Sequence, residues 1–334
     1  MISPENQACR WTIWHDRLHK QILLNKELLP KDSTLLVCVS GGQDSMSLLQ
    51  LLIDLKKFHG WELFIWHGNH SWHNKSEEIA KELEQWCKKQ QLTFFCDTAI
   101  KGSIKNENLA RNWRYKNIEK TALLISKTYP CHYTVTGHTA SDKAETLILN
   151  LARGANLKGL GSHKEQRELT ANLKLVRPLL CFTRDETNRI CKELNIPIWL
   201  DPSNNDLDLR RNLIREKVLP VLEEIHPGCT LRIAYLSQRL SNYHTDQTLI
   251  AKLAIKTIEN RDGLCRLSLS NLTTSARATL LAEWIIKLGG PTTSSKQLEE
   301  ISHKLSTKKG SGSKDLRNGW KITWTNSYVK LECA

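Results

Sequence analysis

Paired cysteines are missing from this sequence. It has ten cysteines, but none forms a C-x-x-C pair, and the closest two, Cys87 and Cys96, lie nine residues apart. The ligand spacings typical of zinc and iron–sulfur sites are therefore absent. Cys38 lies in an apolar run and Cys87 in a helical pattern, so we expect both to be small buried residues of a protein in a reducing compartment.

Long hydrophobic runs are missing as well. No segment approaches the roughly 20 consecutive apolar residues of a membrane-spanning helix. Residues 1–14 lack the basic stretch and apolar run of a secretory signal. We therefore expect no membrane partner and a cytoplasmic location, or the organelle stroma if the chain is encoded in a plastid.

Acidic residues are too few to balance the basic ones. Lys and Arg number 48, whereas Asp and Glu number 35, which gives a net charge of +13 at pH 7. This surplus suits a polyanionic partner, although charge alone does not identify one. The segment 304–330 has seven basic residues and one acidic residue, and its Gly-Ser-Gly-Ser run at 310–313 is typical of a flexible hinge.

Apolar runs of strand length alternate with segments of helical period in the first half of the chain. The pattern predicts strands at 34–39, 62–66, 92–97 and 132–136, and helices at 75–89, 106–128 and 140–153. This alternation is typical of an α/β fold with a doubly wound, mostly parallel sheet. Further along, 173–178 is strand-like, and Thr183 and Glu186 form a capping box that opens another helix.

The pattern changes near residue 200. Residues 201–206 are a turn-forming run, and helical segments follow at about 210–258 and 271–305. Trp320 and Trp324 alternate with polar residues, which favours the core of a small β element over a base-stacking surface. We therefore predict a first domain over 1–215 and a smaller, mainly helical C-terminal domain over 216–334.

A loop rich in serine and glycine follows the first predicted strand and opens a helical segment. It consists of Ser40, Gly41, Gly42, Gln43, Asp44 and Ser45. Glycines let backbone N–H groups approach phosphate oxygens, serine hydroxyls add donors, and the helix N-terminus supplies a partial positive charge. We predict that this loop binds a pyrophosphate group; a tight turn capped by Asp44 or Ser45 is the structural alternative. Neither G-x-x-x-x-G-K-S/T nor G-x-G-x-x-G occurs, which disfavours a kinase-type P-loop and a dinucleotide fold.

Four segments together resemble one family. The loop SGGQDS looks like the PP-loop of the ATP pyrophosphatases, which cleave ATP between the α and β phosphates. GHTASDKAET at 137–146, N-E-x-x-A-R-x-x-R-Y at 106–115, and DPSN at 201–204 with R-N-x-I-R at 211–215 resemble signatures of the tRNA(Ile)-lysidine synthetases. The matches follow the family order over about 33–222 and fade after about 225, so the chain is similar to a short form.

The resemblance implies an ATP-dependent ligase. Members join free L-lysine to C2 of the wobble cytidine in the CAU anticodon of tRNA(Ile), giving lysidine, AMP and pyrophosphate through an adenylate on the C2 oxygen. It implies ATP and Mg2+ as cofactors, Asp44 as a metal ligand, and tRNA(Ile) and lysine as partners. With this resemblance, we predict that residues 1–215 form the adenylation domain and that the extension over 216–334, with its basic tail, binds tRNA. The sequence leaves the oligomeric state open, and a homodimer is compatible with it.

Two carboxylates and two arginines are the main candidates for the site. Asp142 and Glu145 lie at i and i+3 on one predicted helix face, so their carboxylates converge and could receive an ammonium group or take a proton. Arg111 and Arg114 share a helix face in the same way and suit a carboxylate or phosphate. In isolation such pairs are more often surface charges or intrahelical ion pairs, but the resemblance favours a role in the site.

His138 follows a predicted strand end, where open α/β sheets bind ligands. It is a candidate contact for substrate or adenylate, and a structural histidine is the alternative. The chain departs from the family at Asn69, where the family has a carboxylate, at His73, where Arg is frequent, and at Lys143, where Gln is usual. No role is carried over to these three positions.

Two other functions fit part of the evidence. A PP-loop enzyme that thiolates tRNA shares the loop and the basic charge, but many such enzymes need paired cysteines. A non-catalytic tRNA-binding protein would have little reason to keep the loop together with Asp142 and Glu145. Arg211 and Arg215 suit contacts to a tRNA backbone, and interdomain ion pairing or plain surface charge is an equally good interpretation.

Overall fold

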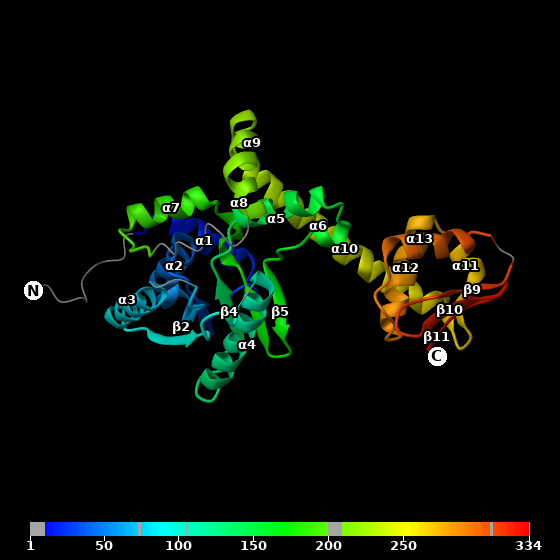
Figure 1. The fold of residues 1–334 in the computed structure, drawn as a ribbon, viewed down its shortest axis with the longest axis horizontal. Coiled ribbons are helices and arrows are strands. Elements are labelled where there is room, and N and C mark those ends of the chain that lie inside the picture. The colour runs from blue at the N-terminus through cyan, green and yellow to red at the C-terminus, as the bar shows by residue number, and fades with distance from the viewer. Residues whose placement is uncertain (1–10, 73–74, 105, 200–208, 308–309, 334) are drawn as a thin grey trace, which may run out of the picture. The chain divides into compact units, whose positions relative to one another are not determined.

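The chain divides into two compact units, residues 1–240 and 241–334 (Figure 1). The structure is a computed structural model that describes residues 11–72, 75–104, 106–199, 209–307 and 310–333. The assignment of 1–215 to adenylation and 216–334 to tRNA binding stays a prediction. None of the helices in the described ranges is both long and apolar enough to cross a membrane.

A six-stranded sheet forms the centre of unit 1. Its strands are β1 (Thr34–Cys38), β2 (Glu62–Asn69), β3 (Thr93–Thr98), β4 (Tyr133–Thr136), β5 (Gln166–Thr170) and β6 (Leu173–Val176). Their order is β3-β2-β1-β4-β6-β5, and all neighbours are parallel except β5 and β6. The predicted mostly parallel sheet is confirmed. The chain adds β2 and β3 on one side of β1 and then returns to add β4 on the other side. The strand order therefore reverses direction between β1 and β4, and this is the topological switch point of the sheet.

Helices cover both faces of this sheet. They include α1 (Ile13–Leu24), α2 (Gln43–His59), α3 (Ser76–Lys89), α4 (Glu107–Ile125), α5 (Ala140–Ala152) and α7 (Arg184–Glu193). Leu35 and Val37 of β1 join a core with α1, α2, α3 and α7, whereas Leu36 joins a core with α4. Alternate side chains of a buried strand point to opposite faces, so both faces of β1 are apolar. The predicted helices α3, α4 and α5 are confirmed, and the predicted capping box opens α7.

A string of short helices completes unit 1. It comprises α6 (Leu157–Leu160), η2 (Pro178–Cys181), α8 (Leu209–Leu213), the π-helical turn η4 (Ile214–Val218), α9 (Leu219–Ile225) and the first part of α10 (Cys229–Ile258). Ile214 and Leu219 are buried against Ala144 of α5. This packing attaches residues beyond the predicted boundary at 215 to the α/β unit.

Unit 2 combines helices with an antiparallel sheet. After α10 it contains β7 (Glu259–Asn260), β8 (Gly263–Cys265), α11 (Arg266–Ser270), α12 (Thr274–Lys287), α13 (Ser295–Lys304), β9 (Gly312–Asp315), β10 (Trp320–Trp324) and β11 (Tyr328–Cys333). The strands form a five-stranded sheet in the order β7-β8-β11-β10-β9. Trp324 is buried in the core and Trp320 packs against it half-buried, as predicted. The sheet is larger than expected because β7 and β8 are too short to show a period in the sequence.

Two arginines are buried in unit 2 with structural roles. The Arg277 side chain is 2% exposed and donates to the backbone oxygens of Leu269, Ser270, Leu272 and Ser302. Arg266 donates to backbone oxygens in the same way, including those of Thr307 and Thr325. Carbonyl groups left over at helix ends need donors, and a guanidinium supplies several from one side chain.

Candidate active site

The serine and glycine loop joins β1 to α2 and is held by its own hydrogen bonds. Gly41 has a φ of +89°, which is accessible to glycine at little cost, and Gly42 is the N-cap of α2. The Ser45 hydroxyl accepts from the Ser40 backbone N–H at 3.1 Å and donates to the Gly42 carbonyl at 2.9 Å. The predicted strand, loop and helix are therefore in place, and the loop lies at the positive end of the α2 dipole.

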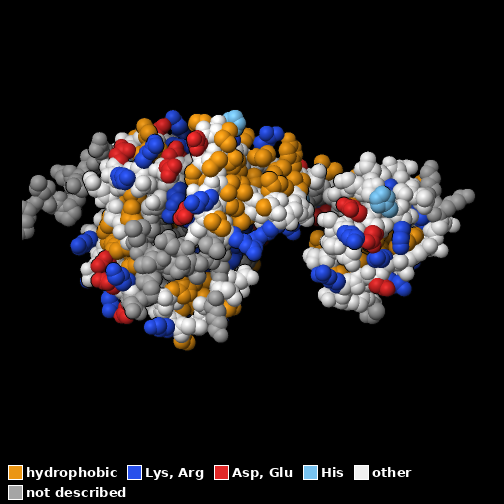
Figure 2. All heavy atoms as spheres, turned by 45° about the horizontal axis from the view of Figure 1, so that its top comes forward, with side chains coloured by type: hydrophobic (Ala, Val, Ile, Leu, Met, Phe, Trp, Pro, Cys, Tyr) orange, Lys and Arg blue, Asp and Glu red, His pale blue; other side chains and the backbone are white. Residues whose placement is uncertain are grey.

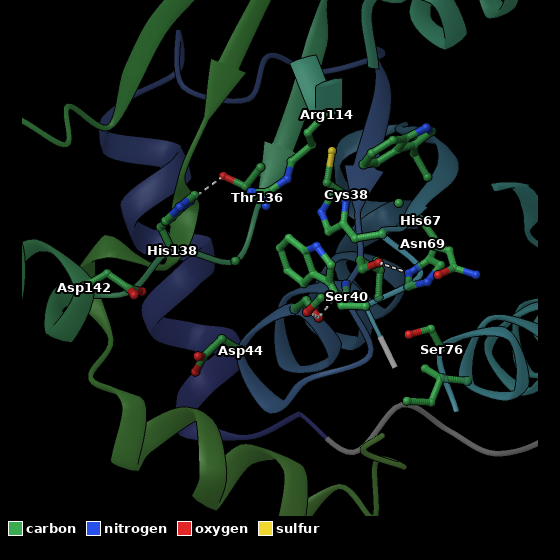
Figure 3. A pocket seen from close by; sticks show the side chains of 18 residues that line it. Cys38, Ser40, Asp44, His67, Asn69, Ser76, Arg114, Thr136, His138 and Asp142 are labelled. Atoms are coloured by element: carbon green, nitrogen blue, oxygen red, sulfur yellow. Dashed lines mark hydrogen bonds between the residues drawn. The ribbon is translucent and has the colours of Figure 1, made fainter. Parts of the chain in front are cut away.

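A cavity of about 340 Å³ opens at the carboxyl ends of β1, β2 and β4 (Figure 3). This is the switch point of the sheet, where open α/β sheets bind ligands. Six of the predicted site residues line it: Ser40, Asp44, Ser45, Arg114, His138 and Asp142. Gly137 allows the close approach, because a Cβ there would lie 2.8 Å from the backbone oxygen of Asp44. The turn after β4 is thereby packed directly against the loop after β1.

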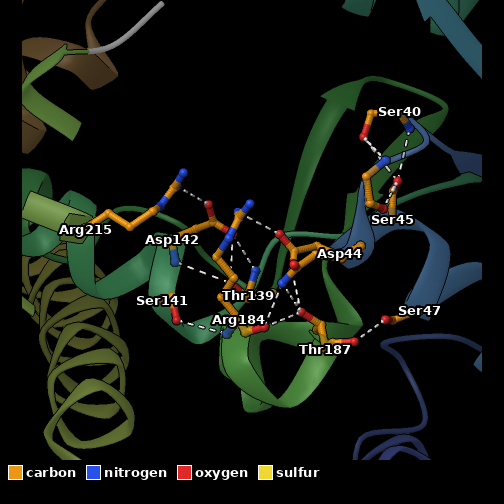
Figure 4. A network of polar contacts seen from close by, with 12 residues as sticks. Ser40, Asp44, Ser45, Ser47, Thr139, Ser141, Asp142, Arg184, Thr187 and Arg215 are labelled. Atoms are coloured by element: carbon orange, nitrogen blue, oxygen red, sulfur yellow. Dashed lines mark hydrogen bonds and ion pairs between the residues drawn. The ribbon is translucent and has the colours of Figure 1, made fainter. Parts of the chain in front are cut away.

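Helix α7 holds the loop from outside the cavity (Figure 4). Arg184 pairs with Asp44 at 3.0 Å, and the Thr187 hydroxyl donates to the other oxygen of the same carboxylate. The Gln43 amide donates to the Arg184 backbone oxygen at 2.7 Å. Burial raises the pKa of Asp44 to about 6, against the lowering effects of Arg184 and Thr187. The Gln43 side chain thus serves to anchor the loop on α7, and Asp44 titrates close to neutral pH.

Asp142 and Glu145 lie on one face of α5 and share two arginines. Arg211 reaches Asp142 at 3.0 Å and Glu145 at 2.7 Å, and Arg215 reaches Glu145 at 2.7 Å. Glu145 is fully buried. Burial alone would raise the pKa of Asp142, but Arg211, His138 and two hydrogen bonds from Thr139 hold it well below its usual range. The predicted convergence of the two carboxylates is therefore present, and Asp142 stays ionised.

The structure places Arg111 and Arg114 differently from each other. Arg114 is half-buried and lines the cavity, whereas Arg111 is exposed and its guanidinium carbon lies 5.3 Å from the centre of the Tyr115 ring. Among the described residues, Arg211 and Arg215 form ion pairs with the α5 carboxylates. Arg211 and Arg215 therefore lie beside Asp142 and Glu145, and a role of Arg111 and Arg114 in the site stays a prediction.

His138 lines the cavity next to a second histidine. Its Nδ1 lies 2.9 Å from the Thr136 hydroxyl, and its ring centre lies 5.3 Å from that of His163. Burial lowers the pKa of His138, and Asp142 opposes this while Arg177 and His163 add to it. His163 has a pKa of about 3, again lowered first by burial and then by Arg177. Both rings are therefore uncharged at neutral pH and can form hydrogen bonds without adding positive charge.

Two of the three positions where the chain departs from the family, Asn69 and Lys143, form hydrogen bonds with other residues of unit 1. The Asn69 amide oxygen accepts from the Ser71 backbone N–H at 2.9 Å, which closes a turn at the end of β2. Lys143 is 3% exposed and donates to Gln238 of α10, and burial lowers its pKa to about 8. His73 and the DPSN segment at 201–204 lie outside the described residues.

The loop carries one carboxylate, that of Asp44, and this restricts the kind of metal ion that the site could bind. Across the described ranges, no group of three or more His, Cys, Asp or Glu side chains is placed to hold a metal. Mg2+ commonly takes one or two carboxylates and completes its shell with water and substrate phosphates. Asp44, in the serine and glycine loop, therefore fits a Mg2+ ion that would arrive with ATP.

The sequence analysis did not predict several of the residues that contact the site. Arg184 and Thr187 lie about 140 residues after the loop that they hold, and Arg177 and His163 lie on the far side of β4. The capping box at Thr183 located the start of α7 but not its contact with Asp44. His163 has a φ of 57°, and a strained backbone of this kind is visible only in the structure.

Known proteins are similar in sequence to this chain over most of its length. A family model described as a PP-loop domain matches residues 15–222. A tRNA(Ile)-lysidine synthase from Prochlorococcus marinus is 47% identical over 324 residues, covering 96% of each chain, and one from another strain is 48% identical over 320 residues, covering 94% of this chain and 98% of its own. One from a Synechococcus species is 37% identical over 322 residues, covering 96% of this chain and 97% of its own.

A solved structure is similar in fold. It is a U34-tRNA thiolase from Methanococcus maripaludis with its 4Fe-4S cluster, with a TM-score of 0.58 and 18% identity, covering 69% of this chain and 78% of that chain. At this identity the likeness concerns the fold alone. The sequence relatives match almost the whole chain, and the family model matches the part that carries the loop and the cavity. This chain belongs to the tRNA(Ile)-lysidine synthase family of PP-loop proteins.

Proposed function

We propose that this chain ligates L-lysine to C2 of the wobble cytidine in the CAU anticodon of tRNA(Ile), using ATP and releasing AMP and pyrophosphate. The observation that carries the proposal is the 43–48% identity to tRNA(Ile)-lysidine synthases over 94–99% of the chain. The serine and glycine loop, Asp142 and Arg114 line the cavity, and Glu145 lies buried beside Asp142 on α5.

The first step forms an adenylate. The cytidine O2 attacks the α-phosphorus of ATP, a C–O–P linkage forms, and the bond to the β-phosphate breaks to release pyrophosphate. The backbone N–H groups of the loop, the Ser40 and Ser45 hydroxyls and the α2 N-terminus would bind the phosphates. Mg2+ held by Asp44 would neutralise part of the phosphate charge.

The second step transfers lysine. Its ε-amine attacks C2, the bond from C2 to the adenylate oxygen breaks, AMP leaves and the attacking nitrogen loses a proton. We infer that Asp142 and Glu145 bind an ammonium group of lysine and that Arg211 or Arg215 pairs with its carboxylate. The low pKa of Asp142 suits ammonium binding better than proton transfer, because a good general base has a pKa near the working pH. Arg114 and His138 line the cavity where the activated base would lie.

The wider partners are proposed on separate grounds. A net charge of +13 suits tRNA, and the reaction would take place where tRNA is modified, in the cytoplasm or in the stroma for a plastid-encoded chain. Exposed hydrophobic residues of α9 and α10 support a homodimer, and Figure 2 shows hydrophobic side chains gathered on one face of unit 1. The exposed hydrophobic residues of α9 and α10 include Val221, Ile225, Tyr235 and Leu236, which are between 47% and 67% exposed.

Thiolation of tRNA is the second candidate, because a thiolase shares the fold. Cys38 lines the cavity, but burial raises the pKa of its thiol to about 11, so it is protonated at neutral pH and is a poor nucleophile. No three-residue metal group is found in the described ranges either. These observations favour the ligase.

The decisive experiment mixes the purified protein with ATP, lysine and a CAU-anticodon tRNA(Ile) transcript. Lysine-dependent AMP release, with lysine recovered in the tRNA, is the expected result. The control replaces the transcript by one with a CAG anticodon. AMP release that does not depend on lysine, or no release at all, would contradict the proposal.

A further inference from the structure

Three arginines gather beside the cavity, at the side of β4 away from the loop. Arg177 directly follows β6, and Arg167 lies in the edge strand β5. The guanidinium carbons of Arg167 and Arg111 lie 4.9 and 5.3 Å from the centre of the Tyr115 ring. The pKa of Arg177 is lowered to about 10, first by burial and then by charge repulsion from Arg167 and Arg111, against the opposing effect of Tyr115. The three positive charges therefore act on one another.

Hydrogen-bond donors of this group lack acceptors. Arg177 is 3% exposed, and its Nη1 donates to the Lys164 backbone oxygen at 2.7 Å. Within the part of the chain that the structure describes, Nε of Arg177 and both Nε and Nη2 of Arg167 are buried without a hydrogen-bond partner. Buried charged donors of this kind are costly, and an anion rich in acceptor oxygens would offset that cost.

The arginine group is next to the cavity but distinct from the pyrophosphate loop. Strand β4 lies between β1, which carries the loop, and β6, which carries Arg177. With neighbouring strands roughly 4.8 Å apart, the ends of β1 and β6 are separated by about 10 Å. His138 lines the cavity and its ring centre lies 5.3 Å from that of His163, whereas Arg177 lies outside the cavity lining, and its charge lowers the pKa of both rings. A second anion can therefore bind here while the loop holds ATP.

We propose that Arg167, Arg177 and Arg111 bind a backbone phosphate of the RNA substrate, next to the nucleotide that enters the cavity. The identity of that RNA rests on the proposed function. A planar guanidinium matches two phosphate oxygens at once, and a phosphodiester relieves the repulsion among the three arginines. Arg167 is half-buried, so a turn of its flexible side chain brings its unpartnered donors to the ligand. A phosphate of ATP offers the same chemistry, and the experiment separates the two sources.

The test measures RNA binding without lysine or ATP. Fluorescence anisotropy gives the affinity of a labelled tRNA(Ile) transcript over a series of KCl concentrations for the wild type, Arg167→Gln and Arg167→Lys. Arg167→Gln is expected to weaken binding about tenfold. It should also flatten the plot of log affinity against log KCl concentration by about 0.7, the effect of one phosphate contact. Arg167→Lys keeps the charge and should restore the slope but not the full affinity.

Further measurements separate an effect of the arginine group from other causes. Lys192→Gln removes one exposed charge from α7 and is expected to leave affinity and slope as in the wild type. Thermal unfolding checks that each variant is folded, and Arg111→Gln, at an exposed position, repeats the test with less risk to folding. The ATP KM, measured by pyrophosphate release, should stay at the wild-type value in Arg167→Gln.

Two outcomes overturn the proposal. If folded Arg167→Gln binds tRNA with wild-type affinity and slope, the arginine group has only a structural role. If the ATP KM rises while tRNA binding is unchanged, the anion is a phosphate of ATP. Failure of the ligase proposal gives a different result. In that case the wild type binds tRNA but shows no lysine-dependent AMP release, and the tRNA affinities of the variants still test the arginine group.

Discussion

Replacing Asp142 by Asn is expected to weaken lysine binding while leaving adenylation in place. One oxygen of Asp142 accepts from the Thr139 backbone N–H and hydroxyl and so caps α5, and the other meets Arg211 at 3.0 Å. An Asn oxygen can keep the cap, so the helix should still form. The variant loses the negative charge and places an amide beside Arg211.

The size of the effect follows from the burial of the site. Side-chain exposure is 15% for Asp142 and 0% for Glu145, so water screens their charges little. Loss of one charged contact should cost about 2–4 kcal/mol of lysine binding. This corresponds to a rise in the lysine KM of about 30-fold to about 900-fold. Glu145→Gln removes the shared counterion of Arg211 and Arg215, so it should also destabilise the fold by about 3–5 kcal/mol.

The assay measures the two steps separately. Pyrophosphate release with tRNA and ATP but no lysine reports adenylation, and radiolabelled lysine in the tRNA reports transfer. Asp142→Asn should keep the first and lose most of the second at a fixed lysine concentration. Glu84→Gln, which removes an exposed carboxylate on α3, is the matched control. An unchanged lysine KM, or lost adenylation with normal lysine binding, would refute this assignment.

Further predictions concern the loop, its pH dependence and unit 2. Asp44→Ala and Ser45→Ala should each abolish AMP formation without unfolding the protein, because the proposed role of the loop is to bind phosphate and metal; normal turnover would contradict the loop assignment. In the metal-free protein the pKa of Asp44 is about 6, so its carboxylate gains a proton as the pH falls through that value, and Mg2+ binding measured by calorimetry should weaken there. Arg184→Gln removes a positive charge that lowers the pKa of Asp44, so the pH midpoint of Mg2+ binding should move to a higher value. An unchanged midpoint argues against Asp44 as the titrating group. Arg277→Met removes the side-chain donors to four carbonyl oxygens and should lower the free energy of unfolding by about 3 kcal/mol in urea titrations, whereas Lys287→Met on the same helix, at an exposed position, should change it by less than about 1 kcal/mol.

The basic segment near the C-terminus shows why charge counts need a structure. Lys308 and Lys309 lie outside the described residues, and Lys314 pairs with Glu300 at 2.8 Å. Lys304 lies over the Trp324 ring, with its Nζ 5.9 Å from the ring centre. Some of the basic surplus is therefore used within unit 2, and contact of this segment with tRNA stays a prediction.

Local sequence determined the strand, loop and helix that make the proposed phosphate site, because period, glycine placement and helix capping act over a few residues. The apolar runs of β1 to β4, the glycines at 41 and 42 and the capping box at Thr183 all had their expected effects. The pairing of Asp142 with Glu145 was equally local, since both lie on one turn of α5. Only the tertiary structure decided what meets these groups. Arg211, Arg184 and Arg177 come from distant segments, and their contacts depend on strand order and helix packing, which no local pattern records.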